Sequence, residues 1–143
     1  MIVVGVDGSP ASIEALRWAA RQAVLTGDDL TAVAAWEWPT TLGWAPPYPE
    51  GYDPASDAQK VLAEAVGKVR PEFPQAKFET RVFEGRPAPV LLGVAKDADL
   101  LVVGSRGHGE FTGMLIGSVS EHCVANARCP VVVVRGLRDH STS

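Results

Sequence analysis

Short, uniformly apolar runs constrain the fold of this chain more than any other feature. Ile2–Val6 and Leu100–Gly104 contain no polar side chain, which is typical of strands buried on both faces of a parallel sheet. Phe78–Val82 instead alternates apolar with polar or charged residues, which indicates a strand with one wet face at a sheet edge. The expected strands are Ile2–Val6, Leu30–Trp36, Phe78–Val82, Leu100–Gly104 and Pro130–Val134.

Amphipathic segments separate these runs. Ser9 is expected to be the N-cap of the first helix, with Pro10 at the first helical position and Gly27 at its end. Helices are also expected from Asp53 to about Arg70, after Glu84–Pro87, and in a segment carrying Val119, Val124 and Ala127. Strands that alternate with helices predict an α/β fold, a doubly wound parallel sheet with helices on both faces.

Length and composition narrow the class of protein. A chain of 143 residues suits one domain, and 46% hydrophobic with 21% charged residues is ordinary for a globular protein. A formal net charge of −4 disfavours nucleic acid and anionic membranes as partners. No apolar run approaches the ~20 residues of a membrane span, and no secretory signal is evident, so a cytoplasmic location is expected.

Two cysteines, Cys123 and Cys129, are the chain's only thiols. No C-x-x-C motif or His/Cys cluster accompanies them, so reduced, structural cysteines are favoured over a redox or metal site. His122 and Cys123 are neighbours on an expected helix and point about 100° apart, which argues against a catalytic dyad. We expect no catalytic residue and no protein metal ligand.

The stretch Leu100–Ser120 predicts an anion site. A buried strand leads into a glycine-rich segment and then into a helix start, and such an arrangement presents backbone N–H groups to a phosphate. Arg106 offers a guanidinium, and Ser105, Ser118 and Ser120 offer hydroxyls. The alternative is structural: Ser118 as an N-cap that forms a capping box with Glu121, with glycines that only make turns.

The spacing Gly104-x2-Gly107-x9-Gly117-Ser118 resembles the nucleotide-binding signature of the universal stress protein family. Val3–Pro10, Thr31–Trp36 and Cys129–Val134 also look like that family's segments in the family's order. The resemblance covers nearly the whole chain. It implies the strand order 3-2-1-4-5, a single domain over residues 1–137 and a polar tail over residues 138–143.

The resemblance further implies an ATP-binding regulatory domain in a stress response, with Mg²⁺ bridging the phosphates. It places Asp7 beside the ribose and the backbone of Ala35 near the adenine, although Asp7 in Asp-Gly-Ser-Pro can equally be a turn residue. His108 is either a phosphate contact or a solvated loop residue. The residues expected to contact the nucleotide are Gly5, Asp7, Ala35, Gly104, Ser105, Arg106, Gly107, His108, Gly109, Gly117, Ser118, Val119 and Ser120.

Two other functions compete with this one. Efficient hydrolysis needs a positioned base and charge stabilisation at the γ-phosphate, and no such set is evident, so the enzymatic alternative is a slow ATPase or an adenylate-transferring enzyme. The other alternative is a protein-interaction module that works without nucleotide. The intact glycine spacing favours the nucleotide-binding reading.

The two expected sheet edges differ. Phe78–Val82 carries charges, whereas Val131–Val134 has none before Arg135, and an apolar edge favours pairing with another strand. We expect a homodimer in which Pro130–Arg135 pairs antiparallel with its symmetry mate, unless the tail or a loop covers this edge. Glu37–Tyr52 is expected to be an aromatic-rich loop, either a lid or partner surface or a loop packed on its own side chains.

Overall fold

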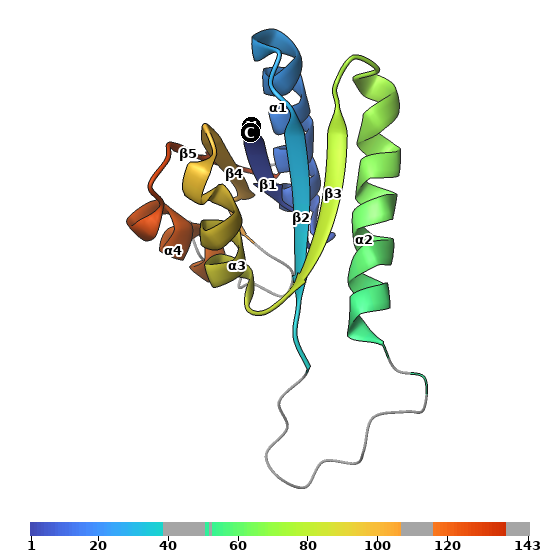
Figure 1. Cartoon of the computed structure of the whole chain (residues 1–143), viewed down its shortest axis with the longest axis vertical. Coiled ribbons are helices and arrows are strands. Elements are labelled where there is room, and N and C mark those ends of the chain that lie inside the picture. Colours follow the sequence, from blue (N-terminus) through green and yellow to red (C-terminus); the bar gives the residue numbers. More distant parts are fainter. Residues whose placement is uncertain (39–50, 52, 107–115, 137–143) are drawn as a thin grey trace, which may run out of the picture.

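The computed structural model describes residues 1–38, 51, 53–106 and 116–136, and Figure 1 shows them as one parallel sheet between helices. The sheet has five strands in the order β3-β2-β1-β4-β5, and every neighbouring pair is parallel. The predicted fold class and strand order are confirmed.

In chain order the elements are β1 (Ile2–Gly5), α1 (Pro10–Thr26), β2 (Leu30–Trp36), α2 (Pro54–Val69), β3 (Phe78–Glu84), α3 (Pro87–Val94), β4 (Leu100–Gly104), α4 (Ser118–Asn126) and β5 (Val131–Val134), with short 3-10 turns at Arg70–Glu72 and Ala95–Asp97.

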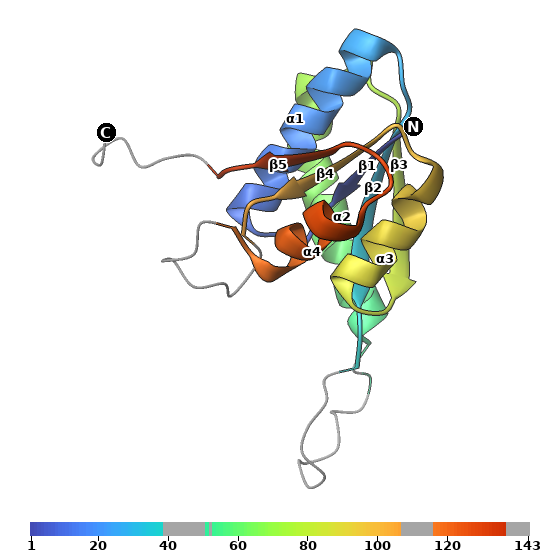
Figure 2. The ribbon, with the colours of Figure 1, turned by 90° about the vertical axis from the view of Figure 1, so that its left-hand side faces the viewer.

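Helices cover both faces of the sheet, which explains the uninterrupted apolar strands. α1 and α2 pack on one face, and α3 and α4 on the other; Figure 2 shows α1 and α4 on opposite sides of the sheet. Two hydrophobic cores result, one on each face of the sheet, and adjacent residues of β1 belong to different ones. Val4 packs with Leu16 beneath α1, and Val3 packs with Leu91 beneath α3. All three side chains of Val3, Val4 and Leu16 are fully buried, so each strand residue contributes to one of two cores.

The predicted ends of the first two helices are confirmed by their hydrogen bonds. The Ser9 hydroxyl accepts a hydrogen bond from the Ser12 N–H at 3.2 Å, and Pro10 is the first helical residue. Gly27 ends α1 in the left-handed conformation, with φ of 78°. Asp53 caps α2 by accepting hydrogen bonds from the two N–H groups that follow Pro54.

Three strand boundaries differ slightly from the prediction. β1 ends at Gly5 rather than at Val6. β3 continues to Glu84 because Phe83 and Glu84 pair with Ala35 and Trp36 of β2. β5 begins at Val131 rather than at the preceding proline, which has no N–H to give to a strand ladder. β3 and β5 are the two edges of the sheet, as predicted.

The fourth helix departs more clearly from the sequence prediction. Gly117 is its N-cap and makes no side-chain capping bond, so the capping box proposed for Ser118 and Glu121 is wrong. The fully buried residues of the helix are Ser120 and Cys123. Of the apolar residues expected in this segment, Val119 and Ala127 are partly buried against the core, whereas Val124 is 53% exposed. Ala127, expected on the helix, is its C-cap.

Three sequence predictions fall wholly or mainly outside the described residues: those for residues 107–109, for most of residues 37–52, and for the tail 138–143. Within the described part, no helix combines the length and apolar character that crossing a bilayer requires.

Candidate functional site

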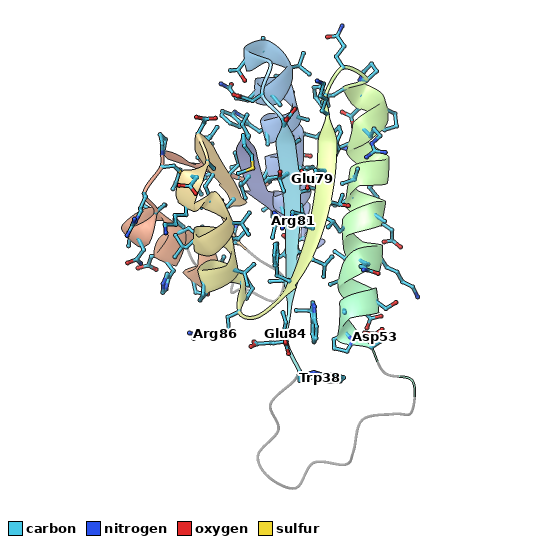
Figure 3. All side chains as sticks on the ribbon, in the orientation of Figure 1. Trp38, Asp53, Glu79, Arg81, Glu84 and Arg86 are labelled. Carbon is cyan, nitrogen blue, oxygen red and sulfur yellow. The ribbon has the colours of Figure 1, made fainter. Side chains whose placement is uncertain are left out.

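A cavity of about 80 Å³ lies at the carboxyl ends of the central strands, which is the edge where open α/β sheets bind ligands. In Figure 1 this is the lower end of the sheet, and Figure 3 shows Trp38, Asp53, Glu84 and Arg86 at the same end. Residues from β1, β2, β4, α1, α3 and α4 contribute to the wall. They are Gly5, Val6, Asp7, Ser12, Val33, Ala35, Pro87, Leu91, Val103, Gly104, Arg106, Val119 and Ser120.

Most of the predicted site residues that the structure describes meet at this cavity. Those lining it are Gly5, Asp7, Ala35, Gly104, Arg106, Val119 and Ser120. Ser105, Gly117 and Ser118 are described but are not in the wall. Gly107, His108 and Gly109 lie outside the described residues.

Sequence reasoning missed several wall residues, chiefly those that helices bring to the strand ends. Pro87 and Leu91 come from the first turns of α3, and Ser12 comes from the first turn of α1. A usable signal existed for each helix, because the start of a helix that follows a parallel strand lies at the ligand-binding edge. Val6, Val33 and Val103 had none beyond their places in buried strands.

Leu91 occupies the space that a side chain on Gly5 would need. A Cβ built on Gly5 would lie 2.8 Å from Cδ1 of Leu91, which is closer than two carbon atoms approach without displacement. Gly5 therefore permits α3 to pack its leucine over the end of β1. With Val33 and Pro87, Leu91 makes one part of the cavity wall apolar.

The turn from β1 into α1 is held by hydrogen bonds around Asp7. Its Oδ1 accepts a hydrogen bond from the Ser9 N–H at 2.8 Å, and its own N–H donates to the Ser12 hydroxyl at 3.2 Å. The Ser12 hydroxyl in turn donates to the Ser9 carbonyl at 3.0 Å. Asp7 thus has the turn role that its sequence context allows, and it also lines the cavity.

The ends of β4 and α4 are joined through the carbonyl oxygen of Ser105. This oxygen accepts hydrogen bonds from the Gly117 N–H and from the Ser120 hydroxyl, the latter at 3.0 Å. The Ser105 N–H donates to the Val134 carbonyl of β5 at 2.7 Å. Gly117 itself has φ of −77° and ψ of 167°, a conformation open to any L-residue, so its backbone angles do not require glycine.

The backbone of Ala35 faces the cavity. In a parallel sheet the N–H and C=O of one residue point to the same neighbouring strand, and those of the next residue point to the other. Val33 bonds towards β1, because its carbonyl accepts from the Val6 N–H at 2.8 Å, and Trp36 bonds towards the β3 side, because its carbonyl accepts from the Gly85 N–H at 2.7 Å. Ala35 must therefore point towards β1, but the register of β1 with β2 ends at Gly5 and Val33. Its N–H and C=O are therefore directed to the β1 side, just past the last paired residues, and Ala35 is one of the residues that line the cavity.

The two cysteines are not poised for nucleophilic chemistry. Burial raises the pKa of the Cys123 thiol to about 11, and burial is also the main reason that the pKa of Cys129 is raised. A thiol with a raised pKa is largely protonated near neutral pH and is a poor nucleophile. Across the described residues, no three His, Cys, Asp or Glu side chains gather into a potential metal site.

Comparison with known proteins gives a consistent result over nearly the full chain. The model of the universal stress protein family matches residues 1–135. A universal stress protein of Mycolicibacterium smegmatis is 41% identical over 135 residues, covering 94% of this chain and 45% of that protein. One from Mycobacterium tuberculosis is 39% identical over 144 residues, covering 96% and 44%. The chain therefore spans less than half the length of these curated relatives.

Solved structures extend the comparison to ligands. A universal stress protein in complex with cAMP is 28% identical, with a TM-score of 0.71 and coverage of 95% of this chain and 96% of that one. The universal stress protein from Archaeoglobus fulgidus in complex with dAMP is 25% identical, with a TM-score of 0.68 and coverage of 93% and 95%.

Proposed function

Because this chain belongs to the universal stress protein family, we propose that its cavity binds an adenine nucleotide, with ATP as the physiological ligand. The domain would then be a nucleotide-dependent regulatory module in a stress response rather than an efficient enzyme. Two solved relatives, in complexes with cAMP and dAMP, support an adenine ring with attached phosphate as the ligand class.

The backbone of Ala35 is the observation that carries the adenine assignment. The strand alternation directs one N–H donor and one C=O acceptor of this residue to the β1 side of β2, beyond the last β1–β2 pair, and Ala35 lines the cavity there. The edge of adenine offers a matching pair, since N1 accepts a hydrogen bond and the 6-amino group donates one. A purine with a 6-oxo group and a protonated N1 offers the reverse pair. The apolar wall made by Val33, Pro87 and Leu91 suits the faces of such a ring.

The polar residues of the wall suit the rest of a nucleotide. Asp7 offers a carboxylate to ribose hydroxyls, and Arg106 offers a guanidinium to phosphate oxygens. Ser118 begins α4 and adds a hydroxyl at the same end of the sheet. Mg²⁺ would bind mainly to phosphate oxygens and water, since this ion keeps much of its hydration shell in nucleotide sites.

The proposal is tested first by identifying what the protein carries and then by comparing two purines. Mass spectrometry of the denatured, purified protein should release an adenine nucleotide. Titration calorimetry with Mg²⁺ should then show ATP binding at least tenfold tighter than ITP, which differs from ATP only at positions 6 and 1 of the ring, because unpaired buried polar groups cost about 1–3 kcal/mol. Equal affinity for ATP and ITP would refute the role of Ala35. Failure to bind any adenine nucleotide would favour the nucleotide-independent interaction module.

We also propose a homodimer through the β5 edge, with Pro130–Arg135 pairing antiparallel with the same segment of a second copy. The position of β5 at the end of the sheet supports this proposal. All four valines of Val131–Val134 are only partly buried, so a partner strand would cover both apolar side chains and the open backbone edge.

A further inference from the structure

The side chain of Ser120 is almost completely buried, at 1% exposed. Its hydroxyl forms hydrogen bonds within the protein. The oxygen lies 3.0 Å from the carbonyl oxygen of Ser105 and 3.1 Å from that of Gly117. A hydroxyl carries one proton, so this donor is shared between two carbonyl groups. The hydroxyl proton is therefore used in hydrogen bonds to the backbone, which disfavours the predicted donation of a hydrogen bond from this side chain to a phosphate.

The two carbonyl groups belong to the segments on either side of residues 107–115. Ser105 directly follows β4, and Gly117 directly precedes α4. Ser105 is itself fixed, because its N–H donates to Val134 of β5 at 2.7 Å and its carbonyl also accepts from the Gly117 N–H. The Ser120 hydroxyl is thus the side-chain part of a junction that joins the sheet to the first turn of α4.

Two cavity residues are direct neighbours of this junction. Arg106 follows Ser105, and Val119 precedes Ser120, and both line the cavity. The hydrogen bonds at the Ser105 carbonyl join the residues beside them, and the Arg106 carbonyl also accepts a hydrogen bond from the Ser9 hydroxyl at 3.5 Å. Ala35 and the apolar wall near Leu91 belong to β2 and α3 and take no part in these bonds.

We propose that Ser120 is a positioning residue of the nucleotide site: by bridging Ser105 and Gly117, its hydroxyl holds Arg106 and the first turn of α4 in the geometry that receives the phosphates. This inference rests on the proposed function. It separates Ser120 from the residues that contact ligand, and it predicts that the hydroxyl affects recognition of phosphate but not of base.

The test compares ATP with adenosine in Ser120→Ala. Titration calorimetry should show ATP affinity reduced about tenfold, with adenosine affinity changed less than twofold, because the base side of the cavity does not depend on the junction. Ser120→Thr, which keeps the hydroxyl, should restore most of the ATP affinity. If Ser120→Ala does not fold, Ser120→Cys replaces it, because its thiol is a weak S–H donor of similar size. This variant should lose less ATP affinity, and its loss should again be larger for ATP than for adenosine.

Cys123→Ala is the matched control, since Cys123 is buried on the same helix and the change also removes one heavy atom. Its ratio of ATP to adenosine affinity should equal that of the unchanged protein. Equal losses for ATP and adenosine in Ser120→Ala, or no loss for either, would overturn the positioning role while leaving nucleotide binding intact. An unchanged protein that binds neither compound would overturn the proposed function, and this inference with it.

Discussion

Gly104 at the end of β4 faces Ala11 in the first turn of α1 so closely that a Cβ on Gly104 would lie 2.8 Å from the Ala11 carbonyl carbon. The next nearest atom, the Ser12 nitrogen, would be 2.9 Å away. Both are backbone atoms, which cannot move aside as a flexible side chain can. The first glycine of the signature is therefore explained by the packing of helix on strand, even though it also lines the cavity.

Gly104→Ala should lower the free energy of unfolding by about 1–3 kcal/mol, the usual cost of forcing extra volume into a packed site. Urea denaturation measures this change. Gly93→Ala is the control: Gly93 is exposed on α3 with nothing within 4 Å of a new Cβ, so the change should stabilise the helix by about 0.5–1 kcal/mol. A fully stable Gly104→Ala protein with lost ATP binding would instead make Gly104 a ligand residue.

Asp7→Asn should separate the turn role of Asp7 from its proposed ligand role. The asparagine carbonyl can still accept the hydrogen bond from the Ser9 N–H, so the free energy of unfolding should change by less than about 0.5 kcal/mol. ATP affinity should fall severalfold, because a carboxylate is the stronger acceptor for ribose hydroxyls.

Asp7→Ala is the companion variant and should lose about 1 kcal/mol of stability as well, since the turn bond disappears. Urea denaturation measures the free energy of unfolding and titration calorimetry measures the ATP affinity, on the same samples. Unchanged ATP affinity in Asp7→Asn would leave Asp7 as a turn residue only.

Thiol reactivity should follow burial. Cys123 is fully buried and its pKa is raised to about 11, whereas Cys129 is partly exposed. A thiol reagent at pH 8 should modify Cys129 in the folded protein and reach Cys123 only in denaturant. Mass spectrometry of the modified peptides distinguishes the two sites, and equal labelling of both would contradict the buried placement of Cys123.

The same pKa shift makes stability depend on pH in a defined window. The folded pKa of Cys123 lies above the value of about 8.5 expected in an unfolded chain. Its contribution is therefore complete below pH 8.5 and is lost as pH rises towards 11, because the thiol ionises first in the unfolded state. Urea denaturation between pH 7 and 10.5 should show a steeper fall for the unchanged protein than for Cys123→Ala.

Val133→Asp should abolish the proposed dimer, because a carboxylate at the β5 edge opposes strand pairing. Sedimentation velocity at micromolar concentration should show a dimer for the unchanged protein and a monomer for the variant. Thr80→Asp, an exposed position on the opposite edge strand β3, should leave association unchanged. A monomeric unchanged protein would refute the interface.

The sequence was sufficient for the layered α/β architecture, because runs such as Ile2–Val6 have no polar side even though they are short. It was not sufficient for the strand order. Hydrophobic patterns record that β1 is buried on both faces, but they do not record that its neighbours are β2 and β4. The order came from the resemblance to a family.

The candidate site was predictable where its residues follow strands directly, as Asp7 and Arg106 do. Pro87 and Leu91 lie at the start of α3 and line the cavity; the rule that helix starts lie at the ligand-binding edge indicates this end of the sheet, but which residues of the helix reach the cavity depends on packing between distant segments. On α4, a hydrogen bond to Ser105 satisfies the buried hydroxyl of Ser120, whereas the apolar Val124 is exposed; the apolar pattern alone does not show this distribution.

The place of β1 at the centre of the sheet governs when the chain can fold during its own synthesis. Ile2 pairs with Leu30 on one side and with Leu100 on the other. At about 5–20 residues per second, a ribosome that has released the first strand needs roughly another 5–20 seconds to deliver the segment that completes its pairing. Throughout that interval β1, whose side chains of Ile2, Val3 and Val4 are buried in the folded protein, has one unpaired side that is open to pairing with other strands.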